Sequence, residues 1–227
     1  MICLSWGAWV RCWSRYLLFF WVLLLVGCGS GSNPSPNPTP LPDFVVDDFE
    51  RPSLGGNWTI YIGDVAIINN SDLGMRSQSG PLFGLGIVAW GAAVFSANQF
   101  SEGEISRDVD ANSLYEVFVR RRVSDGLRYG LAWQPGTSGG EWVLKRDGAT
   151  GAPVLVAVSA AKPLPGDRIR IEARGNLLQG FQNGVQVIEV TDSVLTEAGQ
   201  PGVAMNISQV TLFPSSFFKS WTGGSLN

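Results

Sequence analysis

The sequence predicts an all-β domain, an antiparallel sandwich of two sheets, behind an N-terminal leader and a disordered tether. Three observations carry this prediction. From Asp43 onward, short runs of β-type residues alternate with turn signals, without a sustained helical period. The 28 Gly, 13 Pro and 9 Trp favour many short strands over long helices. Hydrophobic residues reach 45% and charged residues only 15%, so the chain is expected to fold around a core.

The expected strands are runs rich in Val, Ile and aromatic residues, each bounded by turn residues. Asp125-Gly126, Asp147-Gly148 and Asn183-Gly184 lie between successive runs and are typical of hairpins and tight turns. This spacing favours one sandwich rather than two domains. Strands are expected at 44–49, 58–60, 65–68, 86–90, 100–106, 113–123, 128–133, 141–147, 154–158, 167–173, 177–182, 185–191, 203–207 and 219–222.

The leader contains an unbroken apolar run, Tyr16–Val26, preceded by Arg11 and Arg15. The run is too short for a membrane span and predicts the hydrophobic region of a signal peptide. It ends in Leu25-Val26-Gly27-Cys28, which resembles the lipobox of bacterial lipoproteins. The resemblance implies cleavage before Cys28 and acylation of that residue, for example with palmitate. The alternative is an ordinary secretory signal with an incidental cysteine.

The lipobox-like motif divides the chain into three expected segments. Residues 1–27 are the expected signal peptide, 28–42 a lipidated cysteine with a tether rich in Pro, Ser and Asn, and 43–227 the sandwich. Several acyl chains at ~0.8 kcal/mol per buried CH₂ would make a stable anchor, so the membrane is an expected partner. Gly29 follows the cysteine, which in the lipoprotein sorting pattern favours the outer membrane.

The composition excludes several chemistries. Histidine is absent, which removes Ser-His-Asp triads, Cys-His dyads and His-ligated metal sites. The three cysteines are Cys3, Cys12 and Cys28, so residues 43–227 contain no thiol for a disulfide, a metal or a nucleophile. Without the leader, 14 basic residues face 19 acidic ones, and a net charge of −5 disfavours nucleic acid as a partner.

Several motifs within residues 43–227 resemble concanavalin A-like (laminin-G-like) jelly-roll modules of bacterial and phage proteins. The resemblance implies the jelly-roll form of the sandwich, a fold that hosts lectins, glycanases and interaction modules. We expect a non-catalytic module that binds a polysaccharide or glycoconjugate; the alternative is a structural or adhesion domain that binds a protein. The motifs are Asp48-Phe49-Glu50-Arg51, Leu54-Gly55-Gly56-Asn57-Trp58-Thr59, Phe95-Ser96-Ala97-Asn98-Gln99-Phe100, Tyr129-Gly130-Leu131-Ala132-Trp133, Asp167-Arg168-Ile169-Arg170-Ile171-Glu172, Gln200-Pro201-Gly202-Val203-Ala204 and Trp221-Thr222-Gly223-Gly224.

A degenerate glycanase is the remaining alternative. Retaining glycanases of the resembled fold carry Glu-x-Asp-x-Glu on one strand, which places their carboxylates on one face. The nearest match is Glu102-Gly103-Glu104-Ile105-Ser106, whose third acidic position is occupied by Ser106. The motif therefore lacks its acid/base, and we expect no polysaccharide-cleaving activity.

The strands around Asp125-Gly126 predict two faces. A two-residue turn there would pair Val123 with Arg128 and Arg121 with Gly130, and would place Trp133 opposite Trp142 in the next hairpin. The first face then carries Phe118, Leu131, Trp133, Trp142 and Leu144. The second face carries Tyr115, Arg121, Arg128, Gln134, Glu141, Lys145 and Asp147.

Both faces have two interpretations. The aromatic face is either core between the sheets or a sugar-stacking platform. The polar face is either solvated, with ion pairs such as Arg128 with Asp147, or a ligand surface with a notch at Gly130. In the ligand interpretation, the candidate binding residues are Tyr115, Arg121, Gln134, Glu141 and Lys145.

Calcium is the one candidate cofactor, because many modules of the resembled fold bind it. Oxygen ligands of the kind Ca²⁺ prefers lie at expected strand ends, without EF-hand spacing. Capping of turns by the same side chains is the alternative role. The candidates are Asp47, Asp48, Asp108, Asp110 and Asn112.

Overall fold

The computed structural model describes residues 43–76, 84–106, 113–135, 139–148, 153–207 and 215–227. Contacts divide the chain into residues 1–39 and a compact unit formed by residues 40–227. The signal peptide, Cys28 and the tether to Pro42 lie outside the described residues. Within the described ranges, no helix is long and apolar enough to cross a membrane.

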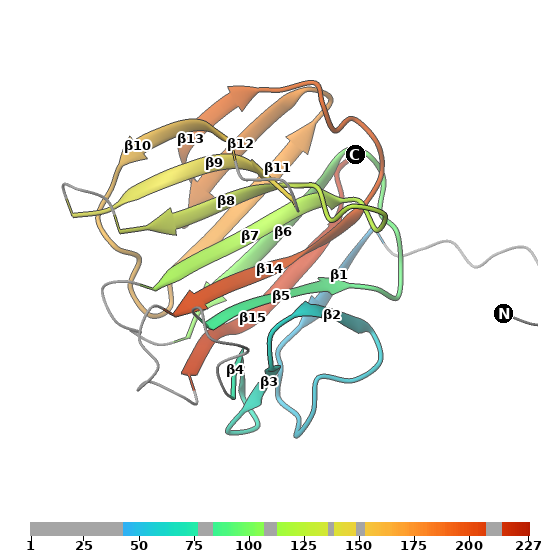
Figure 1. Ribbon diagram of the computed structural model, residues 1–227, viewed down its shortest axis with the longest axis vertical. Coiled ribbons are helices and arrows are strands. Elements are labelled where there is room, and N and C mark those ends of the chain that lie inside the picture. The colour runs from blue at the N-terminus through green and yellow to red at the C-terminus, as the bar shows by residue number, and fades with distance from the viewer. Residues whose placement is uncertain (1–42, 77–83, 107–112, 136–138, 149–152, 208–214) are drawn as a thin grey trace, which may run out of the picture. The chain divides into compact units, whose positions relative to one another are not determined.

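Two antiparallel sheets, here sheets A and B, pack face to face (Figure 1). Among the described residues, sheet A has the order β13-β12-β11-β6-β15-β4-β3, with β1 added beside β15. Sheet B has the order β10-β9-β8-β7-β14-β5-β2 and forms the front layer in Figure 1. Neighbouring strands come from distant parts of the chain, as β7 and β14 do. The fold is therefore the predicted all-β jelly-roll sandwich.

The strands are short, as their β-branched and aromatic composition and frequent glycines predict. Those of sheet A are β1 (Phe44–Asp47), β3 (Val65–Ile68), β4 (Asp72–Met75), β6 (Gln99–Ile105), β11 (Arg168–Arg174), β12 (Leu177–Gln182), β13 (Val185–Thr191) and β15 (Ser215–Ser225). Those of sheet B are β2 (Trp58–Ile62), β5 (Gly84–Trp90), β7 (Leu114–Arg121), β8 (Arg128–Gln134), β9 (Glu141–Asp147), β10 (Val154–Ser159) and β14 (Gln200–Ile207). Each expected strand overlaps an observed one, and β4 is an additional strand that the sequence pattern does not predict.

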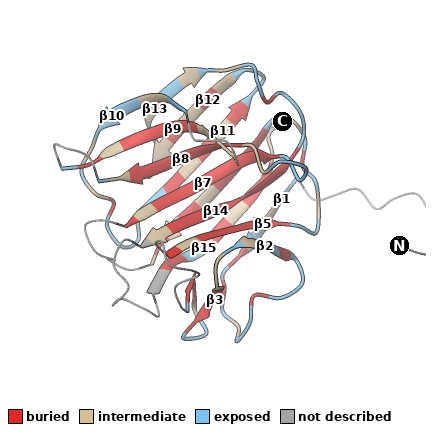
Figure 2. Ribbon diagram, in the orientation of Figure 1, coloured by how far each residue is buried: buried red, intermediate tan, exposed pale blue. Residues whose placement is uncertain are grey.

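The core lies between the sheets, where alternate residues of each strand meet. Trp133, Trp142 and Trp221 are each about 1% exposed and belong to this cluster. Burial also runs along both faces of the central strands of sheet B, whereas β10 at its edge is largely exposed (Figure 2). The outer face of sheet B is therefore partly buried and is not a flat surface that is fully exposed to solvent.

The hairpin of β8 and β9 has the predicted register. Trp133 lies opposite Trp142 and Leu131 opposite Leu144. All four side chains face the core between the sheets. Of the two interpretations of the aromatic row, the core interpretation is therefore confirmed for Trp133 and Trp142.

The predicted register of β7 against β8 is wrong by three residues. Phe118, not Arg121, lies opposite Gly130. The connection is a four-residue loop closed by the Arg122 amide donating to the Leu127 carbonyl at 2.9 Å, so the pairing shifts by two. A further residue is absorbed by a bulge, because β7 advances from Phe118 to Arg121 while β14 advances only from Gly202 to Gln200.

The bulge is centred on Arg120, whose φ is +53°. Its guanidinium is turned inward and donates to the carbonyls of Ala97 at 2.7 Å and Leu195 at 2.6 Å. A shift by one residue exchanges the two faces of a strand. Residues 115–119 consequently face opposite to the prediction, while Arg121 beyond the bulge keeps the predicted face.

Candidate functional site

The outer face of sheet B carries a groove with a cavity of about 590 Å³. Strands β2, β5, β7, β8, β9 and β14 all contribute to it, together with the loop that joins β7 to β8. The described residues lining it are Tyr61, Ile62, Leu85, Ile87, Leu114, Glu116, Arg121, Val123, Ser124, Asp125, Gly126, Arg128, Lys145, Asp147, Gly148 and Asn206.

Four charged side chains in the groove form a closed ring of ion pairs, the groove quartet Glu116, Arg128, Lys145 and Asp147. Arg128 donates to Glu116 at 2.9 Å and to Asp147 at 2.9 Å. Lys145 lies 2.7 Å from the Glu116 carboxylate and 3.3 Å from that of Asp147. The predicted pair of Arg128 with Asp147 is therefore present. Two cations and two anions neutralise one another and are held rigidly by shared partners.

The quartet lies on neighbouring strands because alternate residues of β7, β8 and β9 point to the same face. Burial raises the pKa of Glu116, but the charges of Arg128 and Lys145 outweigh this effect and hold its pKa below the usual range. Burial lowers the pKa of Lys145, and the Glu116 carboxylate more than offsets that and raises it. At neutral pH Glu116 is therefore ionised beside two cations and is a poor proton donor.

Arg121 forms a second feature of the groove. Its guanidinium carbon lies 3.2 Å from the centroid of the Tyr61 ring. Tyr61 is itself held by its hydroxyl, which donates to Gln200 Oε1 at 2.6 Å. This stack of a planar cation on an aromatic ring crosses from β7 to β2 and presents a fixed positive group to the cavity.

A small apolar cluster accompanies these polar groups on the outer face. It consists of Ile87, Ala89, Phe118 and Ala204, with Tyr61 and Leu85 packed against it. The guanidinium of Arg128 lies 5.2 Å from the centroid of the Phe118 ring. The groove therefore combines apolar surface with a few fixed polar groups, the usual composition of a small-ligand site.

The five candidate ligand residues separate in the structure. Arg121 and Lys145 line the cavity. Gln134 and Glu141 share the outer face, but they bond to each other at 2.9 Å and do not line the cavity. Tyr115 is fully buried in the core and contacts Phe217 and Phe218, so its predicted place on the ligand face is wrong. The β7 bulge is the reason.

The predicted notch at Gly130 is also absent. A Cβ at this position would lie 2.6 Å from Oε1 of Glu116, so the carboxylate already occupies the space. The bulge places Glu116, rather than Arg121, beside this glycine. Gly130 thus makes room for the groove quartet and not for a ligand.

The partial glycanase motif does not contribute to the groove. Glu102 and Glu104 do share one face of β6, as predicted, but β6 belongs to sheet A. Both carboxylates accept from the exposed guanidinium of Arg168, at 3.2 Å and 3.0 Å. They form a charge ladder on the other sheet, not on the sheet of β7, β8 and β9.

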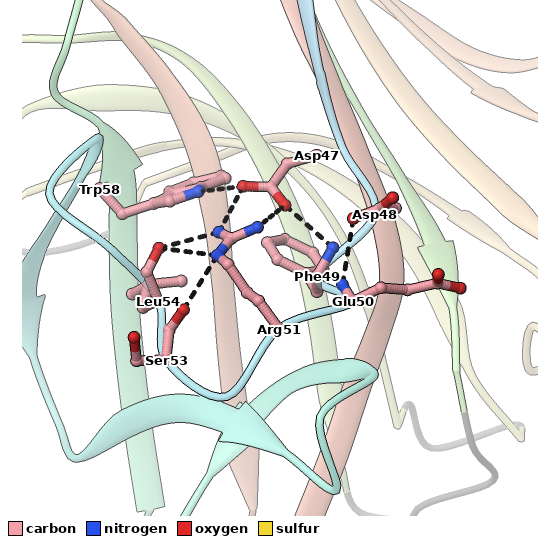
Figure 3. A network of polar contacts seen from close by, with 8 residues as sticks. All are labelled: Asp47, Asp48, Phe49, Glu50, Arg51, Ser53, Leu54 and Trp58. Carbon is pink, nitrogen blue, oxygen red and sulfur yellow. Dashed lines mark hydrogen bonds and ion pairs between the residues drawn. The ribbon is translucent and has the colours of Figure 1, made fainter.

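The candidate calcium ligands give no described metal site. Asp108, Asp110 and Asn112 lie outside the described residues. Asp47 is occupied by protein donors: Arg51 binds both of its oxygens, at 2.6 Å and 2.7 Å, and the Trp58 indole donates at 2.7 Å (Figure 3). Asp48 caps the amide of Glu50. Within the described ranges, no group of three or more acidic or sulfur ligands is positioned for a metal.

Sequence reasoning missed Glu116 and Tyr61. Side chains alternate between the two faces of β7, so the face of Glu116 can be assigned once the bulge at Arg120 is known. The local sequence, however, does not indicate a bulge at Arg120. Tyr61 is about 60 residues distant from Arg121 in sequence, and no periodicity within one strand can place it beside that side chain.

No protein-family model matches this sequence, and no curated protein matches it. Solved structures do match its fold. A carbohydrate-binding module, CBM66 of Bacillus subtilis, is 16% identical with a TM-score of 0.53, covering 74% of this chain and 92% of that one. The VIP36 exoplasmic/lumenal domain, solved with Ca²⁺ and Man3GlcNAc, is 11% identical with a TM-score of 0.54, covering 75% and 84%.

An enzyme shares the fold as well. The endo-β-1,3-glucanase of Pyrococcus furiosus is 13% identical with a TM-score of 0.55, covering 82% of this chain and 98% of that one. At these identities the likeness establishes the fold alone, and that fold is the lectin- and glucanase-type β-sandwich.

Proposed function

We propose that the domain is a non-catalytic glycan-binding module whose binding site is the groove of sheet B. The observation that carries the proposal is the groove itself, a cavity of about 590 Å³ with apolar surface, the half-buried ring of Tyr61 and rigidly held polar groups. Sugars offer both hydroxyls and an apolar ring face, and such a site complements both. The similar carbohydrate-binding module and lectin domain support this assignment.

The absence of catalysis is part of the same proposal. Hydrolysis of a glycosidic bond needs one carboxyl group with a raised pKa and a second carboxylate beside the scissile bond. In the groove, Glu116 has a lowered pKa and is held by two cations, so it is a poor general acid. Glu102 and Glu104 lie on sheet A.

Membrane attachment completes the proposal. The lipobox-like Leu25-Val26-Gly27-Cys28 supports acylation of Cys28, and residues 29–42 would form a tether between lipid and domain. Gly29 after the cysteine supports the outer membrane as the site. The protein would then hold glycans at a membrane surface.

A glycan array that compares the wild type with a variant whose groove is blocked tests the proposed binding. Asn206 is half-buried in the groove, so Asn206→Trp fills the cavity and is expected to abolish retention of any glycan bound by the wild type. Gln179→Trp on β12 of sheet A is the matched control and should bind as before. Binding of no glycan, or equal binding by the blocked variant, would refute the proposal; capture of a defined protein instead would favour the adhesion alternative.

A further inference from the structure

Among the described residues of the groove, Arg121 is the one cation that forms no ion pair. Arg128 and Lys145 are neutralised by Glu116 and Asp147. The neighbouring Arg122 pairs with Asp125 at 2.5 Å. Arg121 forms no ion pair with a carboxylate of the described residues, and Asp125, which pairs with Arg122, contributes only a longer-range attraction.

The guanidinium of Arg121 is also short of hydrogen-bond acceptors. The residue is only 7% exposed, and its Nε is buried with no partner. It donates a long hydrogen bond, 3.4 Å from Nη1 to the Arg122 carbonyl, and the Tyr61 hydroxyl is a further nearby acceptor. Burial lowers the pKa of Arg121, and the neighbouring Tyr61 and Asp125 offset this effect only in part. A buried polar group without a partner costs free energy that a ligand can restore.

The guanidinium lies over the Tyr61 ring and lines the cavity, where a ligand can approach it. A planar guanidinium with a fixed edge matches the two oxygens of a carboxylate or sulfate through parallel hydrogen bonds. Lys145 and Arg128 are less suited to this role, because Glu116 and Asp147 already neutralise their charges.

We propose that the groove recognises an acidic saccharide, and that Arg121, stacked on Tyr61, binds its carboxylate or sulfate group. This inference rests on the proposed glycan-binding function and specifies its ligand class. The domain as a whole is net acidic, so attraction of an anionic glycan depends on this local cation and not on the overall field.

Full-length protein in detergent tests the inference by titration with matched pairs of sugars. One pair is an oligogalacturonate and its fully methyl-esterified, neutral form; the other is a sulfated galactan oligosaccharide and its desulfated form. We expect at least one acidic member to bind about 10- to 150-fold more tightly than its neutral partner, the range for charge-assisted hydrogen bonds. The pair that shows the difference distinguishes a uronate from a sulfate ligand.

Substitutions test whether Arg121 causes the preference for the acidic sugar. Arg121→Gln should remove the difference in affinity within the pair, and Tyr61→Leu should reduce that difference. Arg168→Gln is the matched control, since Arg168 is an exposed cation on β11 of sheet A, outside the groove, and it should bind like the wild type. Thermal melting of each variant checks that the fold is intact.

Other outcomes separate the two levels of the proposal. Equal binding of acidic and neutral sugars, or an acidic preference that survives Arg121→Gln, would overturn the role of Arg121 while glycan binding stands. If no sugar binds, either on the array or in the titrations, both the proposed function and this inference are overturned.

Discussion

The carboxylate of Glu116 fills the space above Gly130, where an added Cβ would lie 2.6 Å from Oε1 and 2.9 Å from the carboxyl carbon. Glu116 is 1% exposed and bonds to both Arg128 and Lys145. Because these bonds fix the carboxylate, it cannot move aside as a free surface side chain would. The glycine and the groove quartet therefore depend on each other.

Gly130→Ala tests that dependence. The added methyl group should displace Glu116 and destabilise the protein by about 1–3 kcal/mol, the usual cost of overpacking. Gly56→Ala is the control, since nothing lies within 4 Å of the position that its methyl group would take, and the change should stay within about 0.5 kcal/mol. Urea unfolding measures both, and equal midpoints for the two variants would contradict the expected clash.

Removal of the Glu116 charge should be more costly. Glu116→Gln leaves Arg128 and Lys145 buried beside Asp147 alone, and we expect a loss of about 3–5 kcal/mol in unfolding free energy. Glu104→Gln removes a carboxylate from the exposed ladder with Arg168 and should cost no more than about 1 kcal/mol. Similar losses for the two variants would show that the quartet contributes no more than a surface pair.

The same carboxylate should make stability depend on pH. The folded pKa of Glu116 lies below its usual value of 4.5, since Arg128 and Lys145 outweigh burial. Its contribution is therefore fully present above about pH 4.5 and is lost as the pH falls through the folded value, where the unfolded chain binds more protons. Urea midpoints between pH 7 and pH 3 should fall for the wild type and fall less steeply for Glu116→Gln; parallel curves would be inconsistent with this effect.

The buried tryptophans offer a matched comparison. The Trp58 indole donates to Asp47, whereas the Trp90 indole, in a ring only 5.5 Å away, has no partner among the described residues. Both changes to Phe remove similar volume, so Trp58→Phe should cost about 1.5–3 kcal/mol more than Trp90→Phe, the value of a hydrogen bond to a charged acceptor. Calorimetric or urea unfolding gives the difference, and a loss no greater for Trp58 would contradict it.

Anchoring is tested in cells by metabolic labelling with a fatty-acid analogue. Cys28→Ala should abolish labelling and leave unprocessed precursor, because the thiol that accepts lipid is removed. Cys12→Ala, within the expected signal peptide, is the control and should be labelled normally. Unchanged labelling of the Cys28 variant would exclude this cysteine as the lipid site.

The all-β class and the placement of Trp133 opposite Trp142 on one face follow from the residues of the chain alone, whereas the structure decided that this face is the core. Turn residues and alternating apolar residues are local signals, and the strand period of two converts them directly into faces. The strands 128–133 and 141–147 illustrate this, since their register was predicted correctly from the residues they contain.

The contents of the groove, in contrast, depend on contacts between distant segments. At the bulge, the guanidinium of Arg120 bonds to the carbonyls of Ala97 and Leu195, which approach it through the packing of the fold. That single extra residue moved Tyr115 into the core and brought Glu116 and Phe118 to the outer face. Likewise, Tyr61 meets Arg121 only because β2 and β7 belong to one sheet. A local sequence pattern does not contain information about contacts between distant segments. These features could therefore be identified only from the tertiary structure.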